Sequence, residues 1–175
     1  MPDPDLTPDC ARCDALCCVL PAFDALQSFG FDKPACVACR NLAPDNACRV
    51  HANLIPLGFR GCVVFDCHGA GQRVTSQVFK GRSWRDDPTL MQPMENAFRV
   101  MRRLHQAVVL LTEAAKLPLP PEQQRARQDL LATLDAGRDW TEAALADLEA
   151  GPHLAAVTAY LAQLRSVRDL SPTRR

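Results

Sequence analysis

No cysteine follows Cys67 in this 175-residue sequence, and all nine cysteines fall within its first 67 residues. The chain has no surplus of charge, because 20 basic residues balance 20 acidic ones, and it has no long basic run. It also contains no stretch of 18 or more apolar residues. These absences disfavour a nucleic-acid partner bound through phosphate contacts and a membrane-spanning helix. The confinement of the cysteines argues against their use as scattered core filler.

The N-terminus lacks the features of a secretory signal. Its first five residues, MPDPD, are acidic and proline-rich, with neither a basic region nor an apolar segment. We therefore expect a cytoplasmic protein, in a compartment that keeps thiols reduced. Nine is an odd number, so the cysteines cannot all pair as disulfides within one chain. Short cysteine spacings in such a compartment favour metal binding over thiol redox chemistry or incidental structural cysteines.

Composition divides the chain into two regions. Residues 1–81 combine the cysteines with glycine turns. This predicts an irregular cysteine-rich metal-binding region with short helices and little strand. Residues 82–175 have helical periodicity and short connections, which predict a four-helix C-terminal bundle. The expected fold class is therefore mainly α.

Apolar stripes at three- and four-residue steps mark the four helices. The first helix ends near Lys116, the second runs from Pro121 to Gly137, the third from Asp139 to Gly151, and the fourth begins at Pro152. The stripes are Met94, Phe98, Met101, His105, Val108 and Thr112; Leu130, Leu131 and Leu134; Trp140, Ala144 and Leu148; and Leu154, Val157, Leu161 and Leu164. This pattern predicts that His105 is a packed core histidine and that His153 is exposed. Packing of the helices against each other is favoured over docking on an unknown protein partner.

The first cysteine group has helical spacing. Asp9 is a good N-cap residue, and a helix after it would place Cys10, Cys13 and Cys17 within roughly 60° on one face. Three sulfur atoms would then converge on one centre. Cys18 would point about 100° away, toward a second metal, or toward the same one if the helix ends there.

The other cysteines form three further groups. Cys36 and Cys39 have the two-residue spacing of a metal knuckle, and Cys48 with His51 has the same spacing with imidazole as the second ligand. Cys62 and Cys67 bracket an apolar run at 63–65, which predicts a short strand.

The number of candidate ligands exceeds one tetrahedral site, which needs four. The chain could hold two sites or one polynuclear cluster, or some cysteines could be spare. Zinc and an iron–sulfur cluster are equally compatible with these spacings. His68, beside Cys67, is favoured as a surface histidine.

The sequence carries no clear catalytic motif. The glycines at 69 and 71 lack the GxGxxG pattern, no Walker lysine follows them, and no HExxH is present. Whether the chain is an enzyme stays open.

The cysteine pattern resembles a known family. Residues 10–18, CARCDALCC, match CxxCxxxCC, the signature of the YkgJ-type zinc- or iron-chelating cysteine-cluster family. The later segments CRVH at 48–51, Gly61-Cys62 and DCHGAGQ at 66–72 are similar to the cysteine-rich N-terminal module of bacterial pentapeptide-repeat proteins, here without the repeats. The resemblance covers about residues 10–115. It implies that the metal ligands are Cys10, Cys13, Cys17, Cys18, Cys39, Cys48, His51, Cys62 and Cys67, and that Cys36 is additional.

These observations predict a metal-binding protein, holding zinc or an iron–sulfur cluster, with a structural or electron-handling role. Two alternatives remain. The first is an iron–sulfur enzyme acting on a protein side chain, because flagellin lysine methylases also resemble the CxxCxxxCC family. The second is a thiol or metal redox sensor, in which some thiolates have a lowered pKa.

Overall fold

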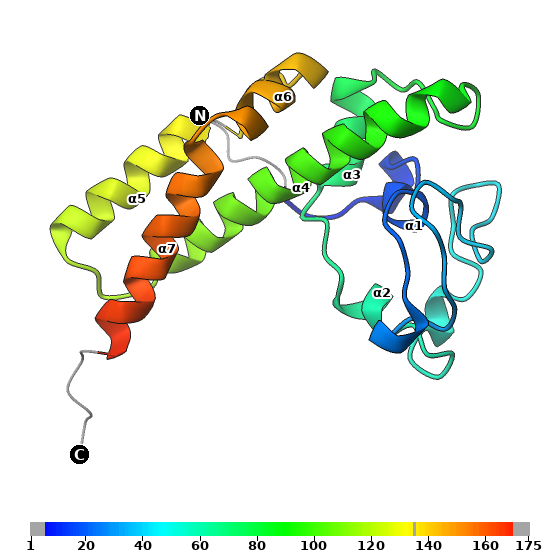
Figure 1. The fold of residues 1–175 in the computed structure, drawn as a ribbon, viewed down its shortest axis with the longest axis horizontal. Coiled ribbons are helices and arrows are strands. Elements are labelled where there is room, and N and C mark those ends of the chain that lie inside the picture. The colour runs from blue at the N-terminus through cyan, green and yellow to red at the C-terminus, as the bar shows by residue number, and fades with distance from the viewer. Residues whose placement is uncertain (1–5, 135, 170–175) are drawn as a thin grey trace.

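The computed structural model describes residues 6–134 and 136–169, and its fold is mainly α-helical (Figure 1). Its helices are α1 (Leu16–Val19), α2 (Arg60–Val64), α3 (Ala70–Arg73), α4 (Met91–Ala114), α5 (Pro121–Leu134), α6 (Glu142–Ala150) and α7 (His153–Asp169). Short 3₁₀ turns lie at Cys10–Arg12, Ala25–Gln27, His51–Asn53 and Pro88–Leu90, and a π-helical turn, Val74–Val78, continues α3. Loops with two isolated antiparallel bridges complete the cysteine-rich half.

Helix α4 runs through the middle of the molecule, with α5, α6 and α7 toward one end and the cysteine-rich loops toward the other (Figure 1). Its buried face includes Met94, Phe98, Met101, His105 and Val108, as the sequence predicts. Thr112 is exposed instead, and the stripe continues through the neighbouring Leu111.

One apolar core joins both halves of the chain. Residues of α1 and α3 pack on α4 together with side chains from the C-terminal helices. Members from the cysteine-rich half include Leu16, Val19, Ala70 and Val74, and members from the far half include Trp140, Leu145, Leu154 and Val157. Side chains from both sides of residue 81 thus share this core, and the division of the chain after residue 81 stays a prediction.

The third bundle helix begins later than its sequence predicts. Thr141, rather than Asp139, is the N-cap of α6, and its hydroxyl accepts a hydrogen bond from the backbone N–H of Ala144 at 3.2 Å. Trp140 lies in the preceding loop, where it is 2% exposed and covered by the guanidinium of Arg138 at 3.9 Å. An indole can reach the core from a loop as well as from a helix. The apolar character of Trp140 therefore led to a predicted start of the helix that is too early. His153, predicted to be exposed, is half-buried.

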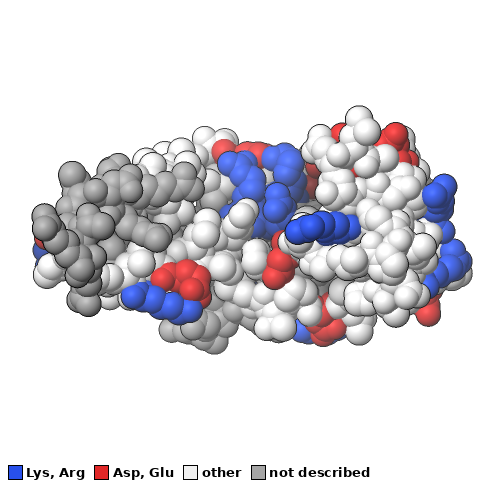
Figure 2. Space-filling view, turned by 90° about the horizontal axis from the view of Figure 1, so that it is seen from below, with Lys and Arg blue, Asp and Glu red and all other residues white. Residues whose placement is uncertain are grey.

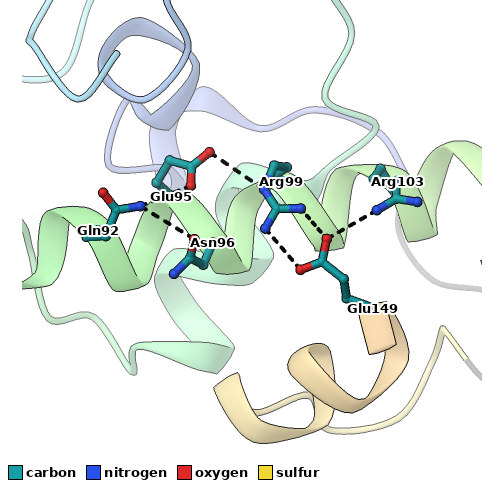
Figure 3. A network of polar contacts seen from close by, with 6 residues as sticks. All are labelled: Gln92, Glu95, Asn96, Arg99, Arg103 and Glu149. Carbon is teal, nitrogen blue, oxygen red and sulfur yellow. Dashed lines mark hydrogen bonds and ion pairs between the residues drawn. The ribbon is translucent and has the colours of Figure 1, made fainter. Parts of the chain in front are cut away.

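Charged side chains fasten α6 to α4 (Figure 3). Glu149 of α6 binds Arg99 and lies 3.2 Å from Arg103, while Arg99 also approaches Glu95 at 3.8 Å. These side chains are 25–47% exposed, so solvent screens the network and it adds little stability beside the apolar contacts. It fixes which face of α6 meets α4.

The surface carries mixed charge. Figure 2 shows Lys and Arg in small groups separated by uncharged and acidic residues on the face it presents. Within the described residues, no helix combines the length and the apolarity required to cross a membrane.

His105 is a buried titratable group of α4. It is 0% exposed, and its Nδ1 lies 2.6 Å from the backbone oxygen of His68, so Nδ1 carries the proton that it donates there. Its Nε2 has no hydrogen-bond partner in the part of the chain that the structure describes. Burial lowers the pKa of His105 to about 4 from its ordinary value of 6.5.

This burial makes folding sensitive to acid. Between pH 6.5 and pH 4 the unfolded chain binds a proton at His105 that the folded chain excludes, so this group's contribution is complete above pH 6.5 and declines as the pH falls. We expect the free energy of unfolding to drop by up to about 3 kcal/mol across that interval. The free energy of unfolding can be measured by urea titration at several pH values. His105→Asn, whose amide can still donate to His68, should remove this part of its dependence on pH. An unchanged dependence on pH in the variant would contradict this assignment.

Candidate metal centre

The first cysteine segment is two short turns rather than one helix. Asp9 caps the turn at Cys10–Arg12, accepting from the backbone N–H of Ala11 at 3.1 Å, as predicted. Ala15 then adopts a left-handed conformation with φ of 54°, which separates this turn from α1. The expected continuous helical face through Cys10, Cys13 and Cys17 is therefore wrong. Leu16 and Val19 are fully buried, so the break turns α1 to place them in the core.

Cys36 and Cys39 lie in a loop that packs beside α1. The backbone N–H of Cys39 donates to the carbonyl of Cys18 at 3.0 Å, and that of Cys36 donates to Leu20 at 3.0 Å. Cys39 is buried, whereas Cys36 is half-buried, with a positive φ of 59°. The charges beside the Cys36 thiol are those of Glu95 and Lys33, not of other thiols.

Cys48 returns to the same place through a tight turn. It forms an antiparallel bridge with Leu42, and the N–H of Leu42 donates to the carbonyl of Cys39 at 2.9 Å. His51 begins the next 3₁₀ turn, and its ring is exposed.

The run between Cys62 and Cys67 is helical, so the predicted strand is wrong. Arg60–Val64 forms α2, closed by the N–H of Phe65 donating to the carbonyl of Gly61 at 3.1 Å. Val63 and Val64 are 50% and 71% exposed. An apolar run predicts a strand only where a sheet can bury it, and the described chain offers none at this point.

All nine thiols are unpaired, and eight of them, all but Cys36, interact electrostatically with at least one other thiol. Burial, with the nearby Cys67 and Cys18, raises the pKa of Cys10. Burial raises the pKa of Cys13 to about 11, and the thiols of Cys67 and Cys10 add to that effect.

A second group of thiols also has pKa values raised by burial and by neighbouring thiols. Burial raises the pKa of Cys62 to about 11, and the thiols of Cys18, Cys39 and Cys48 reinforce it. Burial likewise raises the pKa of Cys39, with Cys18 and Cys48 as its thiol neighbours.

The adjacent pair Cys17 and Cys18 joins these groups. Their sulfur atoms lie 3.9 Å apart. The hydrogen bond that Cys17 gives to Cys18, together with burial, raises the pKa of Cys17 well above its usual range. The same bond lowers the pKa of Cys18, with help from the charge of Lys33. Cys18 is therefore the thiol most readily deprotonated of this pair.

Lys33 is a buried residue of this region that the sequence analysis missed. Its side chain is 4% exposed, and its Nζ lies 2.6–3.0 Å from the carbonyl oxygens of Val19, Pro21, Pro34 and Val37, so its three N–H groups are shared among four acceptors. It therefore fastens α1 to the loop that carries Cys36 and Cys39. Burial lowers the pKa of Lys33, and the neighbouring Cys39, Cys18 and Cys36 oppose that shift. A single lysine between loops gives no sequence signal for this role.

Gly71 and Gln72 position the first cysteine segment against α3. A Cβ at Gly71 would lie 2.5 Å from the sulfur of Cys13, so only glycine leaves room for that thiol. Gln72 is 5% exposed; its oxygen accepts from the N–H of Asp9 at 2.9 Å, and its nitrogen donates to the carbonyl of Thr7 at 2.8 Å. Both residues lie in the 66–72 motif, four and five residues after Cys67, so the motif is the sequence feature that could have indicated their role.

Asp14 fastens the same segment to two distant turns. It is 6% exposed, and its carboxylate accepts from the Asn46 amide at 3.1 Å and the Ser83 hydroxyl at 2.6 Å. Its backbone oxygen accepts from the Trp84 indole at 2.9 Å. The loops are thus located by buried polar groups, each with partners, as burial of such groups requires.

The thiols suit a soft metal in their chemistry and neighbourhood. Thiolate sulfur is the donor that structural zinc and iron–sulfur clusters take. As placed, no three of the described Cys, His, Asp and Glu side chains come close enough to hold an ion. Binding therefore requires the sulfur atoms to draw together. Most of the thiols are half-buried rather than enclosed in the core.

Comparison with known proteins finds one informative likeness. The chain is 37% identical over 115 residues to YybG of Bacillus subtilis (strain 168), whose name describes it as uncharacterized. The match covers 66% of this chain and 41% of YybG, so the chain spans about two fifths of that relative's length. No protein-family profile matches the chain. No solved structure matches it either.

Replacing Lys33 should loosen one part of the cysteine-rich half. Lys33→Met leaves four carbonyls without their donor, at a local cost of about 3 kcal/mol, because unsatisfied buried acceptors retain their desolvation penalty. Hydrogen exchange at the amides of Cys36 and Cys39 should then accelerate about 100-fold, while exchange in α4 stays unchanged. Lys80→Met, at an exposed lysine, is the matched control. Equal exchange in the two variants would refute a fastening role for Lys33.

Gly71→Ala should be destabilising only because of the Cys13 sulfur. The added methyl group should cost about 1–3 kcal/mol through overpacking. In a Cys13→Ala background the clash is gone, and the helix preference of alanine should make the same change neutral or stabilising by up to about 1 kcal/mol. Denaturant titrations of the four proteins, with chelator present throughout, measure this coupling. A penalty of the same size in both backgrounds would contradict the contact.

Proposed function

We propose that this chain is a metal-binding cysteine-cluster protein, holding zinc or an iron–sulfur cluster in a structural or electron-handling role. The observation that carries the proposal is the gathering of eight unpaired thiols, from four separate segments, around α1. Each thiol makes the next harder to ionise, as the raised pKa values of Cys13 and Cys62 indicate. A bound metal ion would favour the thiolate forms and displace the thiol protons.

We further place the chain in the YkgJ-type cysteine-cluster family. The CxxCxxxCC signature supports this placement, as do the roles of Gly71 and Gln72 within the 66–72 motif that the resemblance includes. The proposed ligands are those the resemblance implies: Cys10, Cys13, Cys17, Cys18, Cys39, Cys48, His51, Cys62 and Cys67. We also propose a cytoplasmic location, where unpaired thiols persist.

A redox-sensing role is the second candidate, and one observation favours it. Cys17 and Cys18 are adjacent, their sulfurs are 3.9 Å apart, and the pKa of Cys18 is lowered by the hydrogen bond from Cys17 and by Lys33. A thiolate beside a resolving thiol is the usual arrangement of a redox sensor. Reversible loss of two free thiols on mild oxidation, without loss of metal, would favour this role over the first.

Elemental analysis tests the proposal. Protein purified without oxygen should contain stoichiometric zinc or iron. Broad visible absorbance would identify an iron–sulfur cluster and would be compatible with an enzyme that acts on protein side chains. A colourless zinc protein would argue against that enzymatic role. Cys62→Ser should lower the metal content, and Cys36→Ser, at the thiol that stands apart, should not.

The outcome that overturns the proposal is equally concrete. Wild-type protein that is folded in residues 6–81, yet contains no metal and takes up neither zinc nor iron with sulfide, would exclude a metal-binding role. Hydrogen exchange at Cys39 and Ala70, whose amides bond to Cys18 and Cys67, reports whether that half is folded.

A further inference from the structure

We propose that this chain forms a symmetric dimer through an apolar patch at the end of the cysteine-rich half that carries α2. The patch consists of five exposed aliphatic residues, Leu26, Ile55, Leu57, Val63 and Val64, which are 97%, 61%, 48%, 50% and 71% exposed. They come from three segments: the 3₁₀ turn at Ala25–Gln27, the turns that follow His51–Asn53, and α2.

Backbone contacts bring these three segments together. The N–H of Gly61 in α2 donates to the carbonyl of Ser28 at 2.8 Å, two residues after Leu26. A Cβ added at Gly30 would lie 2.7 Å from the carbonyl oxygen of Leu57, so the chain after Leu26 also touches the turns before α2. In Figure 1 the segments lie together at the lower end of the cysteine-rich half. The five aliphatic residues are therefore carried by adjoining parts of one surface.

Packed aromatic rings support this surface from inside. The rings of Phe23 and Phe29 stack with their centroids 4.4 Å apart, and those of Phe31 and Phe59 meet edge to face at 5.2 Å. Phe23 and Phe59 are buried, so rings fill the interior at this end and the aliphatic side chains of the patch lie outside it. A soluble monomer usually exposes apolar side chains singly, whereas a group of them marks an interaction surface.

The charged groups beside the patch have both signs. Arg60 of α2 is exposed and has no ionic partner in the part of the chain that the structure describes. Asp24 and Asp32 flank the turn that carries Leu26, and they accept from the backbone N–H groups of Leu26 and Ala25, both at 2.8 Å. Among the described residues neither carboxylate has a cationic partner. The patch thus borders one free cation and two free anions.

A second copy of the chain suits this combination. In a dimer with a two-fold axis the same patch meets itself, so Arg60 of one copy can approach the partner's Asp24 and Asp32. An anionic membrane would be repelled by these carboxylates, which lie beside the most exposed residue of the patch. A partner with charge of one sign would leave either the cation or the anions unmatched. The zero net charge of the chain opposes no association between copies.

The size of the patch predicts a weak dimer. The exposed fractions of its five residues amount to about three whole aliphatic residues. This is less than a standard interface requires, which buries about 800 Å² on each partner. We therefore expect a dissociation constant in the micromolar range.

Analytical ultracentrifugation of the chain purified without oxygen tests the dimer, with a reductant present so that no disulfide links two copies. The wild-type mass should rise from monomer to dimer across micromolar concentrations. Val64→Asp should raise the dissociation constant at least about 30-fold, the loss typical of a central interface residue. Arg60→Glu should raise it at least about 10-fold, because like charges would then face each other.

Leu117→Asp and Arg125→Glu are the matched controls, since both residues are exposed in the helical half. They should leave the dissociation constant unchanged. If Val64→Asp fails to fold by circular dichroism, Leu26→Asp replaces it.

Two results would overturn the proposal. The first is a wild-type chain that stays monomeric, whether or not it binds vesicles of phosphatidylglycerol, which would assign the patch to a membrane instead. The second is a dimer that neither Val64→Asp nor Arg60→Glu weakens. Metal binding is tested separately by elemental analysis, and neither result would decide it.

Discussion

Four backbone carbonyls, from residues 19 to 37, surround the ammonium group of Lys33. The loops they belong to also pack Phe23 against Phe29 and Phe31, and the ammonium lies over the Phe23 ring at 4.7 Å, so the buried charge and its acceptors act together with a small aromatic cluster. Asp14 and Gln72 fasten the segment around Cys10 and Cys13 by buried hydrogen bonds. Fully bonded polar groups of this kind specify one arrangement, because each unmade bond is costly in a buried site. The cysteine-bearing loops are thereby brought together by protein contacts, which leave the sulfurs as neighbours rather than as a closed coordination shell.

The helical half was predictable because its residues repeat with one period. Met94, Phe98, Met101 and Val108 mark the buried face of α4, and proline and glycine mark the ends of the helices that follow. The errors occurred where a side chain contributes to the core from outside a helix, as Trp140 does. The short strand predicted at residues 63–65 failed for a related reason. Val63 and Val64 are apolar but exposed, so their composition carried no information about a partner strand.

The cysteine groups were recognisable from spacing, but their arrangement was not. Spacing treats residues 10–17 as one helix, whereas burial of Leu16 and Val19 requires the break at Ala15. Which thiols become neighbours depends on contacts between distant segments, such as Cys18 with Cys39 and Cys13 with Gly71. The residues that create those contacts are ordinary lysine, glutamine, aspartate and glycine. Only Gly71 and Gln72 lie within a motif that the sequence analysis singled out, and it assigned them no role.

Cys17 and Cys18 share a peptide bond within α1, so their side chains cannot be oriented independently. A bond formed at one sulfur would restrict the backbone from which the other projects, and the second binding event would then meet less conformational entropy. Occupancy at the two sulfurs would be cooperative, and the coupling would be the same whichever filled first. Because α1 packs directly on α4, that ordering would also reach the helical half through Leu16 and Val19.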